Sequence, residues 1–350
     1  MTLRVAIGPA EVAGTSSALA AGLREHGVDV ELALWSPLPG AFESDRALPR
    51  IARYGYSMGA PARRDVLHYQ FGRTWVPGFV DAAWAALWGR TRVVSFYGDD
   101  CRQADVAARH GWPMAHLKDP AADRGIRRRL RRLARLCHGA VVMDLEVASY
   151  VTPFFRRVYV TPVPLHERAA EARTDRRPDR FAVVHAPSDE RVKGTPAVRR
   201  AADALARRLP LELVLLSNRP HDDVRAALAR ADVAIDQLHS VSASVFALEA
   251  MRAGLPVLSH LDRRGLAPFH DELPIVHVTA DSLEDTLEQL AHDEGRRRKL
   301  GEAGRRYVER HSASEAGASA LAIYEHARKG EPGVYEATAE GVRRLPEVPA

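Results

Sequence analysis

The sequence predicts an α/β protein with two doubly wound parallel-sheet domains. Its length of 350 residues suggests two domains, at roughly 150 residues per domain. Short apolar runs alternate with helix-like segments, and this alternation starts again in the second half of the chain. Such a rhythm is typical of a mostly parallel sheet that helices cover on both faces.

The first half begins with an apolar run over residues 3–7, which we expect to form a buried strand. A helical pattern over residues 15–26 begins after Gly14 and ends at Gly27. Further strand-like runs cover residues 28–34, 65–71, 92–97, 139–143 and 157–161. Together they define a first domain over residues 1–172.

A polar, charged segment with Pro178 then predicts a linker over residues 173–180. The second domain is expected over residues 181–311. Its strand-like runs cover residues 181–185, 211–216, 232–236, 256–259 and 274–278. A last helix follows over residues 312–329, and the Pro- and Glu-containing tail, residues 330–350, is expected to be poorly ordered.

Composition excludes several classes of protein. The chain is 46% hydrophobic and 27% charged, which is ordinary for a globular protein and unlike a disordered one. Its two cysteines make neither a disulfide framework nor a metal cluster. The N-terminus lacks the apolar core of a secretory signal, so we expect a cytoplasmic protein. The net charge is +5, and nearly all of the basic residues are arginine. No aromatic residues are interleaved with them, so the positive charge does not indicate nucleic-acid binding.

The first chemical motif is HAPSDERVKGTPAV, residues 185–198. A strand is expected to end at its start, and Lys193 and Gly194 open the next helix. A lysine beside the free N–H groups of a helix start forms an anion site, and a glycine lets a phosphate approach the backbone. A surface lysine before an N-cap threonine is the competing interpretation.

The second motif covers residues 231–260, where a strand leads through a polar loop into a helix. Ser242 and Ser244 are placed to cap that helix and leave donors free. Glu249 follows on the second turn among apolar neighbours, so we expect it to be buried. A buried glutamate needs partners, and a ribose diol directed at it would supply them.

Together the two motifs resemble the C-terminal domain of the group 1 (family 4) retaining glycosyltransferases of GT-B fold. Residues 248–257 match the family pattern LEAMxxGxPV in full, and residues 65–72 and 96–102 are similar to its N-terminal motifs. The resemblance implies two domains that face each other across a cleft, with the last helix crossing back to the first. It also implies transfer from a nucleoside diphosphate sugar to a small-molecule acceptor, without a metal or cofactor.

The resemblance assigns a role to each matched residue. Lys193, with Gly194, would bind the donor diphosphate, and Glu249 the nucleoside ribose. Arg191 takes the place of a basic residue that the family carries earlier in that loop. In the first domain, His68 and Asp100 match the family motifs and Tyr97 stands where the family carries a histidine, and these three are taken as catalytic-site residues. Gly14, which opens the first helix, is a candidate for approaching the donor phosphates, with an ordinary helix N-cap as the alternative.

Two departures from the family pattern leave other functions open. Val241 replaces an acidic residue that contacts the sugar, and Tyr97 replaces a histidine near the reacting centre. The alternatives are a catalytically degenerate GT-B protein that binds a ligand or activates a partner, and a membrane-surface enzyme with a lipid acceptor. An epimerase or a phosphorylase of the same fold is a third.

A basic helix is predicted over residues 124–136, with the sequence RGIRRRLRRLARL. Ile126, Leu130 and Leu133 form a narrow apolar stripe on it. A narrow stripe suits packing on a sheet, so a solvated basic face is preferred here over contact with an anionic membrane.

Overall fold

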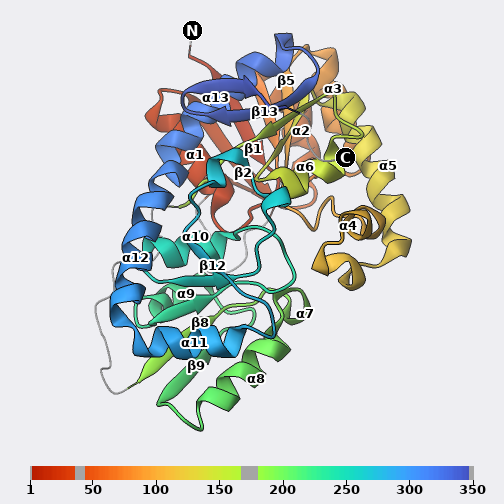
Figure 1. Ribbon diagram of the computed structural model, residues 1–350. Coiled ribbons are helices and arrows are strands. Elements are labelled where there is room, and N and C mark those ends of the chain that lie inside the picture. The colour runs from red at the N-terminus through yellow and green to blue at the C-terminus, as the bar shows by residue number, and fades with distance from the viewer. Residues whose placement is uncertain (1, 36–43, 167–179, 347–350) are drawn as a thin grey trace. The chain divides into compact units, whose positions relative to one another are not determined.

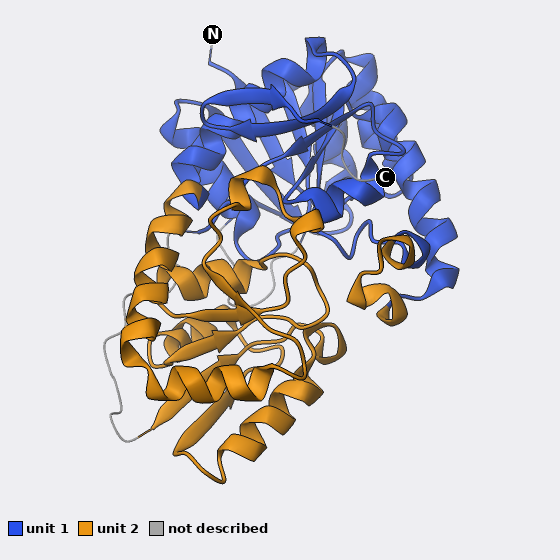
Figure 2. Ribbon diagram, viewed as in Figure 1, with its two compact units in different colours: residues 1–106, 118–167, 311–350 blue, residues 107–117, 168–310 orange. Residues whose placement is uncertain are grey.

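The chain forms two compact units in a computed structural model, which describes residues 2–35, 44–166 and 180–346 (Figure 2). Unit 1 comprises Met1–Val106, Lys118–Glu167 and His311–Ala350, and unit 2 comprises Ala107–Leu117 and Arg168–Arg310. Residues 107–117 thus group with unit 2, although the sequence placed them in the first domain. The predicted linker lies outside the described residues, apart from Arg180.

Unit 1 is built on a nine-stranded sheet with the order β14-β13-β7-β6-β5-β4-β1-β2-β3 (Figure 1). Its strands are β1 (Arg4–Gly8), β2 (Asp29–Trp35), β3 (Arg46–Leu48), β4 (Val66–Tyr69), β5 (Thr91–Phe96), β6 (Gly139–Val142), β7 (Arg157–Val160), β13 (Gly333–Thr338) and β14 (Gly341–Arg344). Neighbouring strands are parallel, except that β14 runs antiparallel to β13. The central strands are buried on both faces, which explains their continuous apolar runs.

Seven helices accompany this sheet in the described part of the chain. They are α1 (Thr15–Glu25), α2 (Ala52–Arg63), α3 (Val80–Leu87), α4 (Ala104–His110), α5 (Pro120–Leu136), α6 (Leu145–Val151) and α13 (Ala313–Lys329). The C-terminal part of α4 belongs to unit 2. No described helix combines the length and the apolar composition needed to cross a bilayer.

The last helix, α13, packs against α1 in unit 1, which confirms the predicted crossover helix. Two glycines allow this close crossing. A Cβ at Gly22 would lie 1.7 Å from the carbonyl oxygen of Ala313, and a Cβ at Gly317 would lie 2.4 Å from the carbonyl carbon of Gly22. A larger side chain at either position would separate the two helices.

The tail is ordered where the sequence predicted poor order. β13 lies parallel to β7, and β14 pairs with β13 in a hairpin. Tyr335 and Ala337 alternate with polar residues and are buried, and Tyr335 stacks on Tyr159 of β7 with ring centroids 5.8 Å apart. This packing stabilises the strand, and composition alone gave no sign of it.

Unit 2 contains a five-stranded parallel sheet with the order β12-β11-β10-β8-β9. Its strands are β8 (Phe181–His185), β9 (Leu211–Leu215), β10 (Val233–Ile235), β11 (Val257–Ser259) and β12 (Ile275–His277). Its helices are α7 (Glu190–Lys193), α8 (Thr195–Leu205), α9 (His221–Leu228), α10 (Val245–Arg252), α11 (Leu283–His292) and α12 (Glu294–Val308). Leucine, valine and alanine side chains of β8, β10, α8 and α11 form one core. The alternation places α7, α9 and α10 after the carboxyl ends of strands, where ligands bind in such sheets.

Candidate functional site

Lys193 is buried in unit 2 and forms an ion pair with a carboxylate that follows the neighbouring strand β10. Its Nζ lies 2.6 Å from Oδ1 of Asp236. Lys193 is only 9% exposed and Asp236 only 1%. A buried lysine and a buried carboxylate compensate each other's charge. The lysine is therefore not a surface residue before an N-cap, which was the competing interpretation of the motif.

Asp236 also binds the start of α10. Its Oδ2 accepts the backbone N–H of Ser244 at 3.1 Å, and its Oδ1 accepts the hydroxyl of Ser244 at 2.6 Å. Ser244 is the N-cap residue of α10, but its side chain makes no capping bond. The sequence assigned the capping role to this serine, and Asp236 instead engages its backbone amide. Ser242 is buried, and its carbonyl oxygen accepts a hydrogen bond from the side-chain amide of Gln237 at 2.6 Å.

Glu249 is buried as expected, at 3% exposure. Its partner is His221, the first residue of α9, whose Nε2 lies 2.5 Å from Oε1 of Glu249. The second carboxylate oxygen, Oε2, has no hydrogen bond within the described residues. One face of the carboxylate is therefore held by the protein, and the other is open to a ligand.

The remaining residues of the first motif have distinct roles. Gly194 adopts a left-handed conformation with φ of 76°, and a Cβ there would lie 2.8 Å from the side chain of Leu238. Close packing thus requires this glycine, independently of any phosphate. His185 bridges the carbonyl of Ile235 and the hydroxyl of Thr195, and burial lowers its pKa to about 4. Arg191 is exposed and has no ion pair among the described residues.

Val241 occupies the position at which the family carries an acidic residue. It is fully buried, and its carbonyl oxygen accepts the N–H of Asp262 at 3.1 Å. A buried valine side chain cannot form a hydrogen bond with a sugar. The replacement noted in the sequence therefore removes a polar contact that an acidic side chain could make at this position. No three His, Cys, Asp or Glu side chains gather as metal ligands in the described ranges.

His68 in unit 1 is held on both sides. Its Nδ1 lies 2.8 Å from the hydroxyl of Tyr324 on α13, and its Nε2 lies 2.7 Å from the hydroxyl of Ser95 on β5. Burial lowers the pKa of this histidine to about 3, so the ring is neutral at physiological pH. Both ring nitrogens are occupied, which favours a positioning role over the catalytic role that the sequence assigned.

Tyr97 and Asp100 are joined by a tight turn after β5. Oδ1 of Asp100 accepts the backbone N–H groups of Tyr97 at 3.0 Å and Gly98 at 2.9 Å, and the Tyr97 hydroxyl donates to Gln70 at 2.8 Å. Oδ2 of Asp100 is buried without a hydrogen-bond partner. Burial raises the pKa of Asp100 to about 6 and also raises the pKa of Tyr97. The unpartnered oxygen is enclosed by the protein, and the two N–H groups that Asp100 holds fix the turn that carries Tyr97.

Gly14 precedes α1 with φ of 80°, as the N-cap residue. The N–H groups that follow it are already bound, because Ser16 and Ser17 donate to the carboxylate of Glu11 at 3.1 and 3.0 Å. The Ser17 hydroxyl donates to the same carboxylate at 2.7 Å. The Glu11 carboxylate therefore occupies the helix start at which the donor phosphates were predicted to bind.

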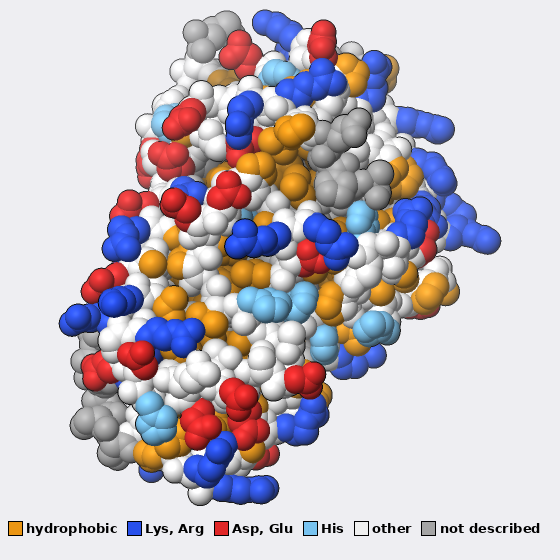
Figure 3. All heavy atoms as spheres, viewed as in Figure 1, with side chains coloured by type: hydrophobic (Ala, Val, Ile, Leu, Met, Phe, Trp, Pro, Cys, Tyr) orange, Lys and Arg blue, Asp and Glu red, His pale blue; other side chains and the backbone are white. Residues whose placement is uncertain are grey.

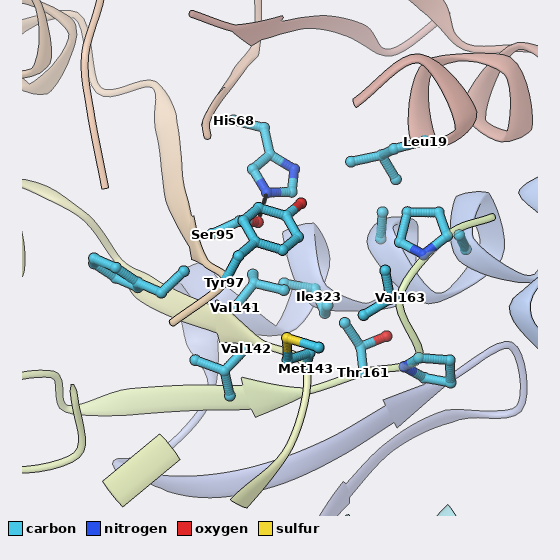
Figure 4. A pocket seen from close by; sticks show the side chains of 15 residues that line it. Leu19, His68, Ser95, Tyr97, Val141, Val142, Met143, Thr161, Val163 and Ile323 are labelled. Carbon is cyan, nitrogen blue, oxygen red and sulfur yellow. Dashed lines mark hydrogen bonds between the residues drawn. The ribbon is translucent and has the colours of Figure 1, made fainter. Parts of the chain in front are cut away.

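A small cavity of about 40 Å³ lies in unit 1 beside these residues (Figure 4). His68, Ser95 and Tyr97 lie together on one side, and aliphatic side chains such as Leu19, Val163 and Ile323 complete the lining. Such a volume holds a few water-sized groups, so the cavity is not by itself a substrate site.

Sequence reasoning missed three residues that hold the candidate residues or fill a helix start: Asp236, His221 and Glu11. Each is a polar residue next to a strand end or a helix start, which is the general signal for a site in this class of sheet. Their pairing joins segments up to 43 residues apart, and no local pattern encodes it.

Solved structures similar to this chain include two glycosyltransferases and a sucrose-phosphate synthase. Sucrose-phosphate synthase from Thermosynechococcus elongatus has a TM-score of 0.63 at 12% identity, over 93% of this chain and 99% of that one. WaaG, a glycosyltransferase involved in lipopolysaccharide biosynthesis, has a TM-score of 0.55 at 14% identity, over 92% and 99%. The chain has a GT-B fold. The glycotransferase of kitacinnamycin shares it with a TM-score of 0.51 at 14% identity, over 93% and 99%.

Neither a protein-family model nor a curated protein matches the sequence. At these identities, similarity to GT-B structures establishes the fold and not the activity. The function therefore has to be argued from the residues of the two units.

Proposed function

We propose that the chain is a retaining, metal-independent glycosyltransferase that moves a sugar from a nucleoside diphosphate to a small-molecule acceptor. The observation that carries the proposal is the buried Lys193 at the carboxyl end of the unit 2 sheet. An ammonium group has three N–H donors, and Asp236 takes one of them. Two remain for the oxygens of a diphosphate.

The other groups of unit 2 fit the remainder of such a donor. Glu249 offers its open Oε2 to a ribose hydroxyl, while His221 fixes the other oxygen. Arg191 supplies an exposed guanidinium two residues before Lys193 on the same short helix, α7. Positive charge that is fixed before the reaction stabilises the negative charge of a departing diphosphate.

The reaction proposed is a front-face displacement. The bond between the anomeric carbon and the diphosphate oxygen breaks, and the acceptor oxygen forms a new bond to the same face of that carbon. The acceptor proton passes to the departing phosphate oxygen, so no protein nucleophile is needed. In unit 1, the Tyr97 hydroxyl would hold the acceptor, Asp100 would fix the turn that carries Tyr97, and His68 would position Ser95.

A thermal-shift panel with UDP, GDP, ADP, CDP and dTDP tests the donor site. A ligand that binds only the native state stabilises it by about 2.7 kcal/mol at a hundredfold excess over Kd. We expect one nucleotide to raise the Tm clearly. The double variant Lys193→Met/Asp236→Asn, which removes both charges of the buried pair, should lose this shift. If the double variant binds the nucleotide as tightly as the wild type, the assignment of Lys193 is wrong.

A second candidate function is a GT-B protein that binds a nucleotide without catalysis. It is favoured by the buried Val241, which offers no sugar contact, and by Glu11, which fills the start of α1. A nucleotide shift together with neither transfer nor donor hydrolysis would select this candidate. Transfer of a labelled sugar to any acceptor would exclude it.

A further inference from the structure

Three helices of unit 1 form one layer on the same face of its sheet. α2 contacts α3, and α3 contacts α5, while α1 packs with α13. α2, α3 and α5 precede β4, β5 and β6, and these connections all move along the sheet in the same direction. The connection from β1 to β2 through α1 moves along the sheet in the opposite direction. Right-handed crossovers then place α2, α3 and α5 together on the face opposite α1. The outward side chains of these three helices point away from the sheet in the same direction.

The exposed large apolar side chains of the described residues all belong to this layer. They are Ile51, Tyr54 and Met58 on and before α2, and Val80, Leu87 and Trp88 on and after α3. The spacing of three and four residues places the first three on one side of α2. Leu87 is 80% exposed and Ile51 is 90% exposed.

The two apolar groups form a continuous surface. The indole N–H of Trp84 on α3 donates to the carbonyl oxygen of Met58 on α2 at 3.0 Å. Trp84 and Trp88 meet edge to face, with ring centroids 6.0 Å apart. The sequence of α3, VDAAWAAL, is apolar on its outer as well as its inner side. A contiguous exposed apolar patch of this kind marks an interaction site.

The third helix of the layer adds positive charge. Its exposed arginines are Arg124, Arg128, Arg131, Arg132 and Arg135, and Figure 3 shows Lys and Arg side chains gathered along this edge of unit 1. None of the five forms an ion pair within the described ranges. The acidic residues of the three helices are Asp81 and Asp123, which are 3% and 5% exposed. The three helices themselves therefore present apolar and cationic groups to solvent, and the exposed carboxylates beside α5 are Asp119 at its N-cap and Asp105, which pairs with Arg127.

We propose that this α2–α3–α5 face binds the surface of an anionic lipid bilayer. Tryptophan and aliphatic side chains insert at the headgroup level, and arginines beside them are attracted to lipid phosphates. An isologous dimer through the same face would bring the exposed arginines of both copies into one interface, where the three helices supply no exposed carboxylate to pair with them. The combination of charge and apolar surface thus favours a membrane over a second copy of the chain.

The sequence of α5 alone favoured a solvated basic face over membrane contact, and the other two helices of the layer reverse that preference. Leu130 and Leu133 of α5 are fully buried in unit 1, so α5 has no free apolar side, as its narrow stripe predicted. The apolar part of the surface comes from α2 and α3, which precede α5 by more than 30 residues. The inference concerns a different surface from the nucleotide site and does not depend on glycosyl transfer.

Co-sedimentation of the full chain with lipid vesicles tests the proposal. We expect binding to phosphatidylcholine vesicles that contain about 30% phosphatidylglycerol, and much weaker binding to phosphatidylcholine alone. Binding should decrease between about 50 and 500 mM NaCl, because salt screens the arginines. No binding to the anionic vesicles at low salt would overturn the proposal.

Two variants separate the charged and the apolar contributions. Arg128→Gln/Arg131→Gln/Arg132→Gln should weaken binding on the order of a hundredfold, at about fivefold per arginine. Leu87→Gln/Trp88→Gln should weaken it at both salt concentrations. A matched control, Arg200→Gln/Arg207→Gln/Arg306→Gln, removes three exposed arginines of unit 2 and should leave binding almost unchanged.

Two results would contradict the assignment of this face. One is an equal loss of vesicle binding in the control and in the α5 variant, which would mean that net charge alone decides binding. The other is a wild-type dimer in light scattering that Leu87→Gln/Trp88→Gln converts to a monomer, without any vesicle binding by the wild type. That result would assign the face to a second copy of the chain. Circular dichroism of all variants checks that these exposed substitutions leave the fold intact.

Discussion

The carboxylate at the candidate site of unit 2 has a counter-charge, whereas two carboxylates of unit 1 that also accept backbone N–H groups have none among the described residues. In unit 2, Asp236 binds the start of α10 and has a lysine 2.6 Å away. In unit 1, Glu11 binds the start of α1 and Asp100 closes the turn after β5, and neither forms an ion pair within the part of the chain that the structure describes. Burial raises the pKa of both unit 1 carboxylates, to about 6 for Asp100.

This difference bears on where an anion can bind. A phosphate that approaches α1 would have to displace Glu11 without gaining a cation. A phosphate that approaches α10 would meet Lys193, whose charge is shared with a single carboxylate. Unit 2 is therefore the better anion site, although both units offer a helix start after a strand.

The largest effect is expected from breaking the ion pair in unit 2. Lys193→Met leaves Asp236 buried without a counter-charge, which costs about 3–5 kcal/mol of the unfolding free energy. Adding Asp236→Asn removes the second charge and should recover most of that loss. Urea unfolding of the two variants and the wild type measures both changes. A single variant as stable as the wild type would mean that the pair is not buried in solution.

A smaller change in the unfolding free energy, this time an increase, is expected when Asp100 of unit 1 is replaced by asparagine. Its pKa is raised from 3.8 to about 6 by burial, so the folded state binds the proton more tightly than the unfolded state. The resulting stabilisation is present below about pH 4 and is lost as the pH rises through 6. Asp100→Asn does not ionise and keeps an acceptor for the N–H groups of Tyr97 and Gly98.

Asp100→Asn should therefore be more stable than the wild type at pH 8, by at most about 3 kcal/mol. The difference should shrink toward pH 4. Urea unfolding at several pH values measures it, and Asp203→Asn, at an exposed carboxylate on α8, is the control. A difference that stays constant with pH would show that the Asp100 carboxyl is not responsible.

Glu11 is expected to have a still smaller effect. Glu11→Ala removes the carboxylate that binds the first N–H groups of α1, at a cost of about 0.5–2 kcal/mol, as for other helix caps. The freed N–H groups should then bind inorganic phosphate. Added phosphate should raise the Tm of Glu11→Ala more than that of the wild type. If added phosphate raises the Tm of both proteins equally, the freed N–H groups at the start of α1 do not bind phosphate.

Much of the fold follows from the sequence because its signals are local. The strand over residues 181–185 and the start of α1 at Thr15 match the expectation, since buried parallel strands read as continuous apolar runs. α2 and β3 were not predicted, because α2 carries Pro61 and exposes apolar residues on its outer side. The hairpin of β13 and β14 was missed because it depends on pairing with β7, over 170 residues away.

The candidate site was predictable by residue but not by partner. The motifs singled out Lys193, Glu249 and His68, and of these three they predicted burial for Glu249 alone, although all three side chains are buried. Their partners are Asp236, His221 and Tyr324, which are 43, 28 and 256 residues away. Charge compensation and hydrogen bonding between such distant segments are set by the packing of the sheet, so they appear only in the structure.

The smallest expected effect is that of metal chelation on nucleotide binding and sugar transfer, and it tests the charge available at the unit 2 site. If Lys193 and Arg191 supply the charge that a diphosphate needs, nucleotide binding and transfer should not change when EDTA is added. Thermal shifts with and without EDTA, and a transfer assay under the same conditions, measure this. Loss of either with EDTA, restored by Mg²⁺ or Mn²⁺, would contradict metal independence. Because Asp236 already neutralises part of the Lys193 charge, this result decides whether the protein's own cations are sufficient at the unit 2 site.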